Sequence, residues 1–209
     1  MKKILVTLLG AFSCINLVSA ESSDKSIIFR TNVIYVDEIL GEVNGGDNGA
    51  GPTAELSFLL GGIDNFYHTI GFEAGYIKSD VDDGIDGVDV KFKTELVPVF
   101  LNYTIGADFG GSTGDKSGFV WEAGLGLGGF FADVELNVDS ASENDDDFVF
   151  GGQVFASVGY GFSEVAGVHI GGRYMLAEDG KFSFKNFGAE AEGEVINSFA
   201  IDVSLNYTF

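Results

Sequence analysis

Few residues of this 209-residue chain could carry out catalysis or bind a metal through soft ligands. The only histidines are His68 and His169, and the only cysteine is Cys14. An imidazole is the most common general base, so a catalytic site would depend on one of these two histidines. Neither lies in a pattern that indicates a nucleophile or a metal site, and we expect both to occupy structural positions.

Acidic segments are the next candidates for chemistry, because carboxylates bind calcium. The segment DVDDGIDGVDV (80–90) has the density of acids of a calcium loop. An EF-hand counted from Asp82 places Gly87 correctly at the sixth position but Lys93 at the twelfth, where a carboxylate is required. We therefore expect a solvated acidic loop, and the same for SENDDD (142–147). Loose divalent binding shared with lipid phosphates remains the alternative.

The stretch GLGLGG (124–129) satisfies the pattern G-x-G-x-x-G. A dinucleotide site would need a helix directly after the last glycine, with its N-terminus at the pyrophosphate. The following residues, FFADVEL, have the character of a strand. We expect no nucleotide or other cofactor here.

The first twenty residues resemble an export signal. Lys2 and Lys3 precede the apolar run ILVTLLGAF, and small residues end at Ala20. This arrangement predicts a signal peptide over 1–20, cleaved after Ala20, and one mature domain over 21–209. Cleavage removes Cys14 and makes the mature chain more negative than the formal −21 of the whole sequence. Such a charge argues against nucleic acid as a partner.

The mature chain consists of segments in which apolar and polar residues alternate. Side chains alternate across a strand, so each segment predicts a strand with one apolar and one polar face. Each is about long enough to cross a bilayer as a tilted strand, which takes about 9–11 residues. The eight segments are 26–37, 53–61, 66–78, 90–106, 119–132, 148–162, 167–176 and 197–209.

The connections between these segments also alternate in character. The turns at 61–65 and 163–167 are short, whereas four longer windows carry most of the acidic residues. We expect these windows to be extracellular loops, with 133–147 open to protease. They are 37–51, 79–89, 133–147 and 178–194. An even strand number with short turns on one side and long polar loops on the other predicts an all-β fold, an eight-stranded antiparallel transmembrane β-barrel with an up-and-down meander.

The last strand resembles the C-terminal sorting signal of outer-membrane barrels. Leu205, Tyr207 and Phe209 are apolar at every second position, and the chain ends on the aromatic ring. Together with VPVFLNY (97–103), EAGLGLGG (122–129) and GGRYM (171–175), this resembles the small bacterial outer-membrane β-barrel family, which includes the OmpA-type transmembrane domain and the opacity-type proteins. The resemblance implies a Gram-negative outer membrane, contact with its lipids and lipopolysaccharide, and assembly by the barrel-assembly machinery.

Charged residues on the polar faces predict an ion-pair network in the barrel lumen. Arg30 and Arg173 flank the last strand, whose inward charge is Asp202, so we expect both arginines to be joined through Asp202. Glu55, Glu73 and Glu122 also point inward. We interpret the six residues as a structural network. A gated path for water or ions is the alternative, although eight strands leave little more than room for side chains.

Pro98 is unusual inside a barrel strand, because proline has no N–H for the ladder. The apolar set also changes from even positions, Val90 and Phe92, to odd positions, Val97 and Val99. The sequence therefore predicts a β-bulge between Thr94 and Pro98.

Three functions remain open at this point. The first is a monomeric, non-enzymatic barrel that supports the membrane or presents acidic loops to an unknown extracellular ligand. The second is a narrow pore or small-solute conduit. The third is a lipid-modifying enzyme, although neither HTIG (68–71) nor HIGG (169–172) matches the His-x-Ser-Asn stretch of outer-membrane lipid A deacylases.

Overall fold

The computed structural model describes residues 27–39, 47–63, 65–85, 88–110, 118–139, 141–163 and 165–209. The predicted signal peptide and its cleavage after Ala20 lie outside these residues. The strands are β1 (Ile27–Ile39), β2 (Asp47–Ile63), β3 (Phe66–Gly75), β4 (Ile77–Ile85), β5 (Val88–Gly110), β6 (Gly118–Val138), β7 (Ala141–Gly161), β8 (Ala166–Ala177), β9 (Asp179–Phe184), β10 (Ala189–Glu194) and β11 (Asn197–Thr208).

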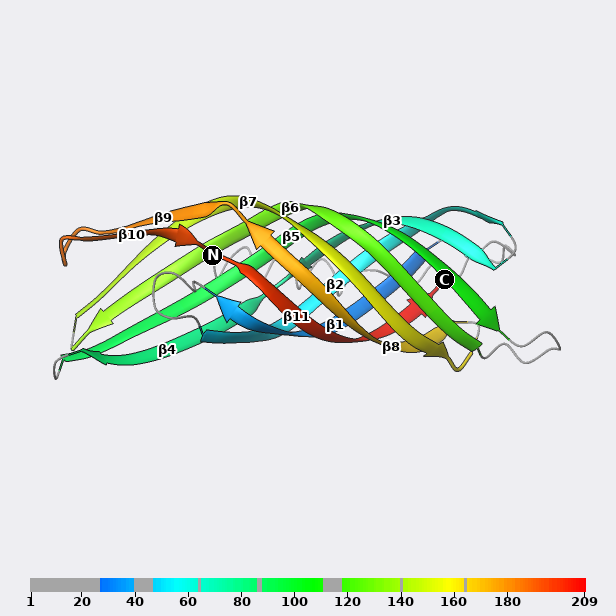
Figure 1. The fold of residues 1–209 in the computed structure, drawn as a ribbon, viewed down its shortest axis with the longest axis horizontal. Helices are drawn as coiled ribbons and strands as arrows, with labels where there is room; N and C mark the ends of the chain where they lie inside the picture. Colours follow the sequence, from blue (N-terminus) through cyan, green and yellow to red (C-terminus); the bar gives the residue numbers. More distant parts are fainter. Residues whose placement is uncertain are drawn as a thin grey trace.

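Eight of these strands close into a ring. The hydrogen-bonded order is β1–β11–β8–β7–β6–β5–β3–β2, and β2 pairs with β1 to complete it. Every pairing is antiparallel, so the predicted eight-stranded up-and-down barrel is confirmed (Figure 1). Closure leaves the ring without an edge and satisfies the backbone groups within the sheet, as a bilayer requires.

Three further strands extend the barrel beyond one end of the ring. β4 continues the course of β3 and pairs with β5, and β9 and β10 form a hairpin between β8 and β11. We call this extension the cap. It comprises β4, β9 and β10 with the adjoining ends of β1, β5, β6 and β7.

The outer surface of the ring is a band of exposed apolar side chains. Leu127, for example, is 70% exposed and Val33 is 66% exposed, values that a water-soluble surface would rarely combine in one band. Aromatic rings gather at both ends of the band, with Phe131, Phe148 and Phe150 in contact near the cap and Tyr207 and Phe209 in contact at the other end. An apolar belt between two aromatic girdles is typical of a transmembrane barrel.

The apolar and polar faces change sides where the ring meets the cap. Along β6, the outward residues change from Leu127 and Phe131 to Asp133. The inward residues change from Glu122 to apolar side chains. The cap therefore has a polar exterior and an apolar core, formed by Val36, Ile39, Ile77, Leu96, Val134, Leu136, Phe182, Phe184, Val195 and Ile196.

The prediction that the acidic windows form long loops is wrong. The window 133–147 consists of the ends of β6 and β7, joined after Asp139, and β9 and β10 occupy most of 178–194. The windows 37–51 and 79–89 likewise begin and end in strand. The predicted protease cut within DSASEND (139–145) is therefore not expected, because each residue from Ala141 to Asp145 lies in β7 and is paired with β6.

The predicted β-bulge between Thr94 and Pro98 is also wrong. β5 pairs with β6 without a register shift from Val90 to Gly110. The change of apolar phase marks the passage from the cap, where the core lies inside, to the ring, where the lipid lies outside. Pro98 lies opposite the break between β3 and β4 and has no partner in either strand, so this position tolerates a residue without an N–H. At that break, the N–H of Tyr76 donates to the carbonyl oxygen of Pro52 at 2.9 Å.

Three carboxylates of β7 attach the β9–β10 hairpin to the barrel. Asp147 accepts from the N–H of Lys181 at 3.2 Å, and Asp145 accepts from the N–H of Ser183 at 2.8 Å. Glu143 accepts from the N–H of Asn186 at 2.8 Å. The alternate acids of SENDDD (142–147) thus bind the backbone of the hairpin in place of a strand ladder. A solvated loop would not make these contacts.

We expect Asp145→Ala to loosen this hairpin. The N–H of Ser183 would lose a charged acceptor, so the free energy of local opening of β9 should fall by about 1–2 kcal/mol. Hydrogen exchange at the amides of Lys181 and Ser183 measures that cost. Asp146→Ala, on the outward face of the same strand, is the matched control, and equal acceleration in both variants would exclude the carboxylate contact.

Candidate functional site

The interior of the ring contains two groups of buried charges. In the first, Arg30 on β1 binds both carboxylate oxygens of Glu122 on β6 through Nη2, at 2.8 and 2.7 Å. Its Nη1 lies 3.7 Å from Glu55 Oε2 on β2. We call these three residues the Arg30 group. Tyr67 also donates its hydroxyl to Glu122, at 2.8 Å.

The second group lies around Arg173 on β8. Its Nη1 binds Glu73 Oε1 on β3 at 2.7 Å, and its Nε binds Asp202 Oδ2 on β11 at 3.1 Å. The Arg173, Glu73 and Asp202 side chains form the Arg173 group. Each carboxylate in both groups is buried, so each depends on its arginine for compensation.

Two side-chain amides connect the groups. Asn102 donates to Glu55 at 3.2 Å and to Glu73 at 2.9 Å. Gln153 donates to Glu73 at 2.8 Å and accepts from Arg173 at 3.0 Å. The sequence does not assign either amide to the network, because their role depends on which strands face each other across the lumen.

All six residues of the predicted network lie inside the barrel, but the predicted link between Arg30 and Asp202 is wrong. Asp202 pairs with Arg173, whereas Arg30 lies opposite Asn206 on β11 and donates to its Oδ1 at 2.9 Å. Asn206 lies four positions after Asp202 on β11, which amounts to about 13 Å along an extended strand. The two arginines therefore compensate different carboxylates.

The histidines do not form a catalytic relay. His169 Nδ1 lies 3.4 Å from Glu122 Oε2 and 3.4 Å from Ser157 Oγ. A serine nucleophile and an orienting carboxylate must occupy opposite nitrogens of the ring, but here both approach the same one. His68 lies on the outer side, where its Nδ1 is 3.3 Å from the hydroxyl of Tyr103.

The glycines of GLGLGG leave room for lumen side chains. A Cβ at Gly124 would collide with the ring of Phe155, and one at Gly126 would collide with Asn102 and Gln153. β6 continues through the motif as a strand, so no helix N-terminus is present for a phosphate.

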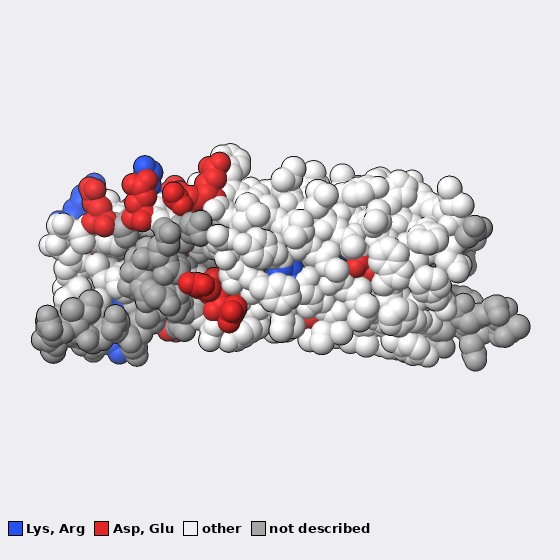
Figure 2. Space-filling view, viewed as in Figure 1, with Lys and Arg blue, Asp and Glu red and all other residues white. Residues whose placement is uncertain are grey.

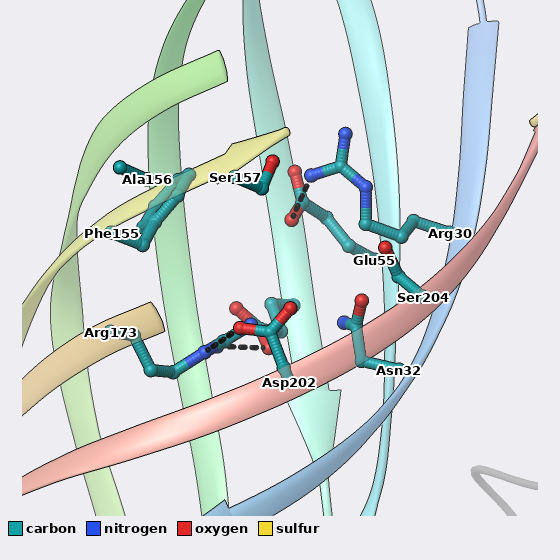
Figure 3. A pocket seen from close by; sticks show the side chains of 10 residues that line it. Arg30, Asn32, Glu55, Phe155, Ala156, Ser157, Arg173, Asp202 and Ser204 are labelled. Carbon is teal, nitrogen blue, oxygen red and sulfur yellow. Dashed lines mark hydrogen bonds and ion pairs between the residues drawn. The ribbon is translucent and has the colours of Figure 1, made fainter. Parts of the chain in front are cut away.

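The lumen contains a small cavity between the two charged groups and a larger one at one end. A cavity of about 10 Å³ lies between the two groups, and Figure 3 shows several of its lining residues. A larger cavity of about 250 Å³ opens at the end opposite the cap, with Tyr67, Glu122, His169 and Asn206 among its lining residues. On the cap side of the charges, the buried side chains of Phe100, Phe130 and Met175 belong to the apolar core. We call these three residues the plug.

The last strand places its signal-like residues at the outer surface. Leu205 is 61% exposed and Tyr207 43% exposed on the lipid-facing side of β11. Phe209 contacts the ring of Tyr207, with centroids 4.6 Å apart, and its N–H donates to the carbonyl oxygen of Ile27 at 2.9 Å. The terminal residue thus also takes part in closing the ring.

Among the described residues, no group of three or more histidine, cysteine, aspartate and glutamate side chains is arranged to hold a metal ion. The same part of the chain contains no helix long and apolar enough to cross a membrane.

Comparison with known proteins gives similarity at the level of the fold. No protein-family model and no curated protein matches the sequence. Neisserial surface protein A is 12% identical, with a TM-score of 0.48 over 90% of this chain and 100% of that chain. OprG from Pseudomonas aeruginosa is 13% identical, with a TM-score of 0.47 over 88% and 96%. Ail from Yersinia pestis is 12% identical, with a TM-score of 0.40 over 88% and 97%. Similarity this distant carries no argument about activity.

Proposed function

We propose that this eight-stranded β-barrel is a non-enzymatic outer-membrane protein whose lumen is closed to solutes. Its role is to support the outer membrane and to present the cap at the cell surface. The observation that carries this proposal is the filled interior, in which the two charged groups and the plug lie one above the other.

The plug argues against the narrow-pore alternative. Phe100 and Phe130 are both buried and meet edge to face, with ring centroids 5.2 Å apart. A hydrated ion would have to pass this apolar layer after leaving the charged groups, and desolvation of a charge is costly. The lipid-modifying alternative is not supported either, because Glu122 and Ser157 approach the same nitrogen of His169.

The cap is the part of the protein that we assign to the cell exterior. Its surface is acidic, and Figure 2 shows carboxylates gathered toward the end of the molecule that carries β9 and β10. The lipid-facing band next to it is almost free of charge in the same view. In the proposed orientation, the cap lies on the side of lipopolysaccharide and the short turns lie in the periplasm.

A shortened variant tests the surface role. Replacing residues 179–194 by a short turn removes the β9–β10 hairpin and leaves the eight-stranded ring. We expect cells with this variant to keep a sealed outer membrane but to lose the surface interactions of the intact protein, measured as adhesion to abiotic and cell surfaces. Equal adhesion by the variant and the intact protein would contradict the role of the cap.

Deleting Phe209 is expected to reduce the yield of assembled barrel. The deletion removes the terminal aromatic ring proposed as the recognition element of the assembly machinery, together with its hydrogen bond to Ile27. The fraction of protein with heat-modifiable gel mobility measures assembly in cells. Refolding of the purified variant in detergent is the control, because a defect confined to cells indicates recognition rather than stability.

A further inference from the structure

The buried charges of the lumen do not balance. With all four carboxylates ionised, Glu55, Glu73, Glu122 and Asp202 oppose only Arg30 and Arg173, which leaves an excess of two negative charges among the described buried residues of the ring. Uncompensated charge on buried side chains is unfavourable, so a further positive species is expected.

Space for such a species lies between the two charged groups. The cavity of about 10 Å³ is lined by side chains of both groups and by Asn32 and Ser204. A volume of this size holds one particle as large as a water molecule. Asn32 and Ser204 face each other across the β1–β11 pair and both point inward.

Asn32 supplies an unused oxygen at this place. Its side chain is 2% exposed, and its Oδ1 has no hydrogen-bond partner. The orientation of the amide follows from its neighbours, because Thr53 donates its hydroxyl to Glu73 at 2.8 Å and must therefore accept from Asn32 Nδ2, at 2.9 Å. The oxygen is left pointing away from Thr53, toward Ser204 and the cavity (Figure 3).

We propose that this cavity binds one monovalent metal cation of the sodium type, with Asn32 Oδ1, Ser204 Oγ and the carboxylates of Asp202 and Glu55 as its ligands. Oxygen ligands suit hard cations. Two of the four proposed ligands are neutral. The two carboxylates already interact with arginine, Asp202 through Oδ2 and Glu55 through Oε2. A divalent ion would demand more charge and more open coordination than these side chains offer.

The test is the stability of the refolded full-length protein in detergent micelles. Thermal unfolding is followed by gel mobility in sodium chloride and in choline chloride at equal ionic strength, since choline is too large for the cavity. A ligand that binds only the folded state raises the midpoint with its concentration. We expect the unfolding midpoint to rise with sodium concentration and not with choline.

Two variants locate the effect. Ser204→Ala removes one ligand and should raise the sodium concentration for half-maximal stabilisation about tenfold, as expected for the loss of about 1.4 kcal/mol of binding. Thr104→Val is the matched control, because Thr104 is another buried inward residue whose hydroxyl has no partner, but it does not line the cavity. This variant should keep the sodium response of the unmodified protein.

Three results would overturn the proposal. Equal midpoints in sodium and choline chloride would mean that the cavity holds water alone. A response to magnesium or calcium chloride without one to sodium would exclude a monovalent site. Loss of the sodium response in Thr104→Val to the same extent as in Ser204→Ala would place the effect elsewhere in the protein.

Discussion

Replacing Arg173 by methionine is expected to lower the free energy of unfolding by about 3–5 kcal/mol, the usual cost of leaving buried charges without a partner. The methionine would occupy similar volume but leave Glu73 and Asp202 uncompensated, although both are buried and lie within 3.1 Å of the guanidinium. Urea unfolding in detergent or lipid, followed by tryptophan fluorescence, measures the change.

Two comparisons separate this effect from the general cost of a substitution. Lys181→Met also breaks an ion pair, with Glu192 at 2.7 Å, but on the exposed surface of the cap, and should change stability little. Adding Glu73→Gln to Arg173→Met removes one stranded charge and should recover part of the loss, because contacting residues are not additive. Strictly additive losses would show that Arg173 and Glu73 do not act as a pair.

Phe130→Ala should destabilise the protein by a similar amount, about 3–5 kcal/mol, because it opens a cavity in the plug. Phe130 is fully buried and packs against Phe100. Its neighbour Phe131 is 48% exposed on the opposite face of β6 and provides a matched control of the same residue type. Phe131→Ala leaves the interior intact and should cost clearly less in the same unfolding measurement.

The relative size of these two effects tests the division of the barrel into an inner and an outer face. If Phe131→Ala proved as costly as Phe130→Ala, the apolar interior would not be a packed plug. The comparison is direct because the two residues differ by one position on the same strand.

The eight strands of the ring and the direction of their side chains could be predicted from the sequence, because alternation has a period of two and depends only on local geometry. Arg30 and Arg173 were placed inside on this basis. Their partners could not be predicted, because a pairing across the lumen depends on the register and tilt of strands that are distant in sequence. The register puts Asn206, not Asp202, opposite Arg30.

The cap was missed for a different reason. Its strands alternate as regularly as the others, but with the apolar residues inward, so the phase change between Phe92 and Val97 resembled a bulge and the acids of 142–147 resembled a loop. Alternation alone cannot distinguish a face that meets lipid from a face that meets a protein core. Asp145 and Asp147 lie in a strand that pairs with β6, and their side chains bind the backbone of β9.

Single-channel recording of the purified, refolded protein in planar bilayers tests the central claim, that the charged groups and the plug close the lumen. We predict no stable conductance above that of the bare bilayer, at either polarity, for protein whose folded state is verified by gel mobility. A steady unitary conductance that Phe130→Ala or Arg173→Met alters would show that ions pass through the interior and would contradict the closed barrel.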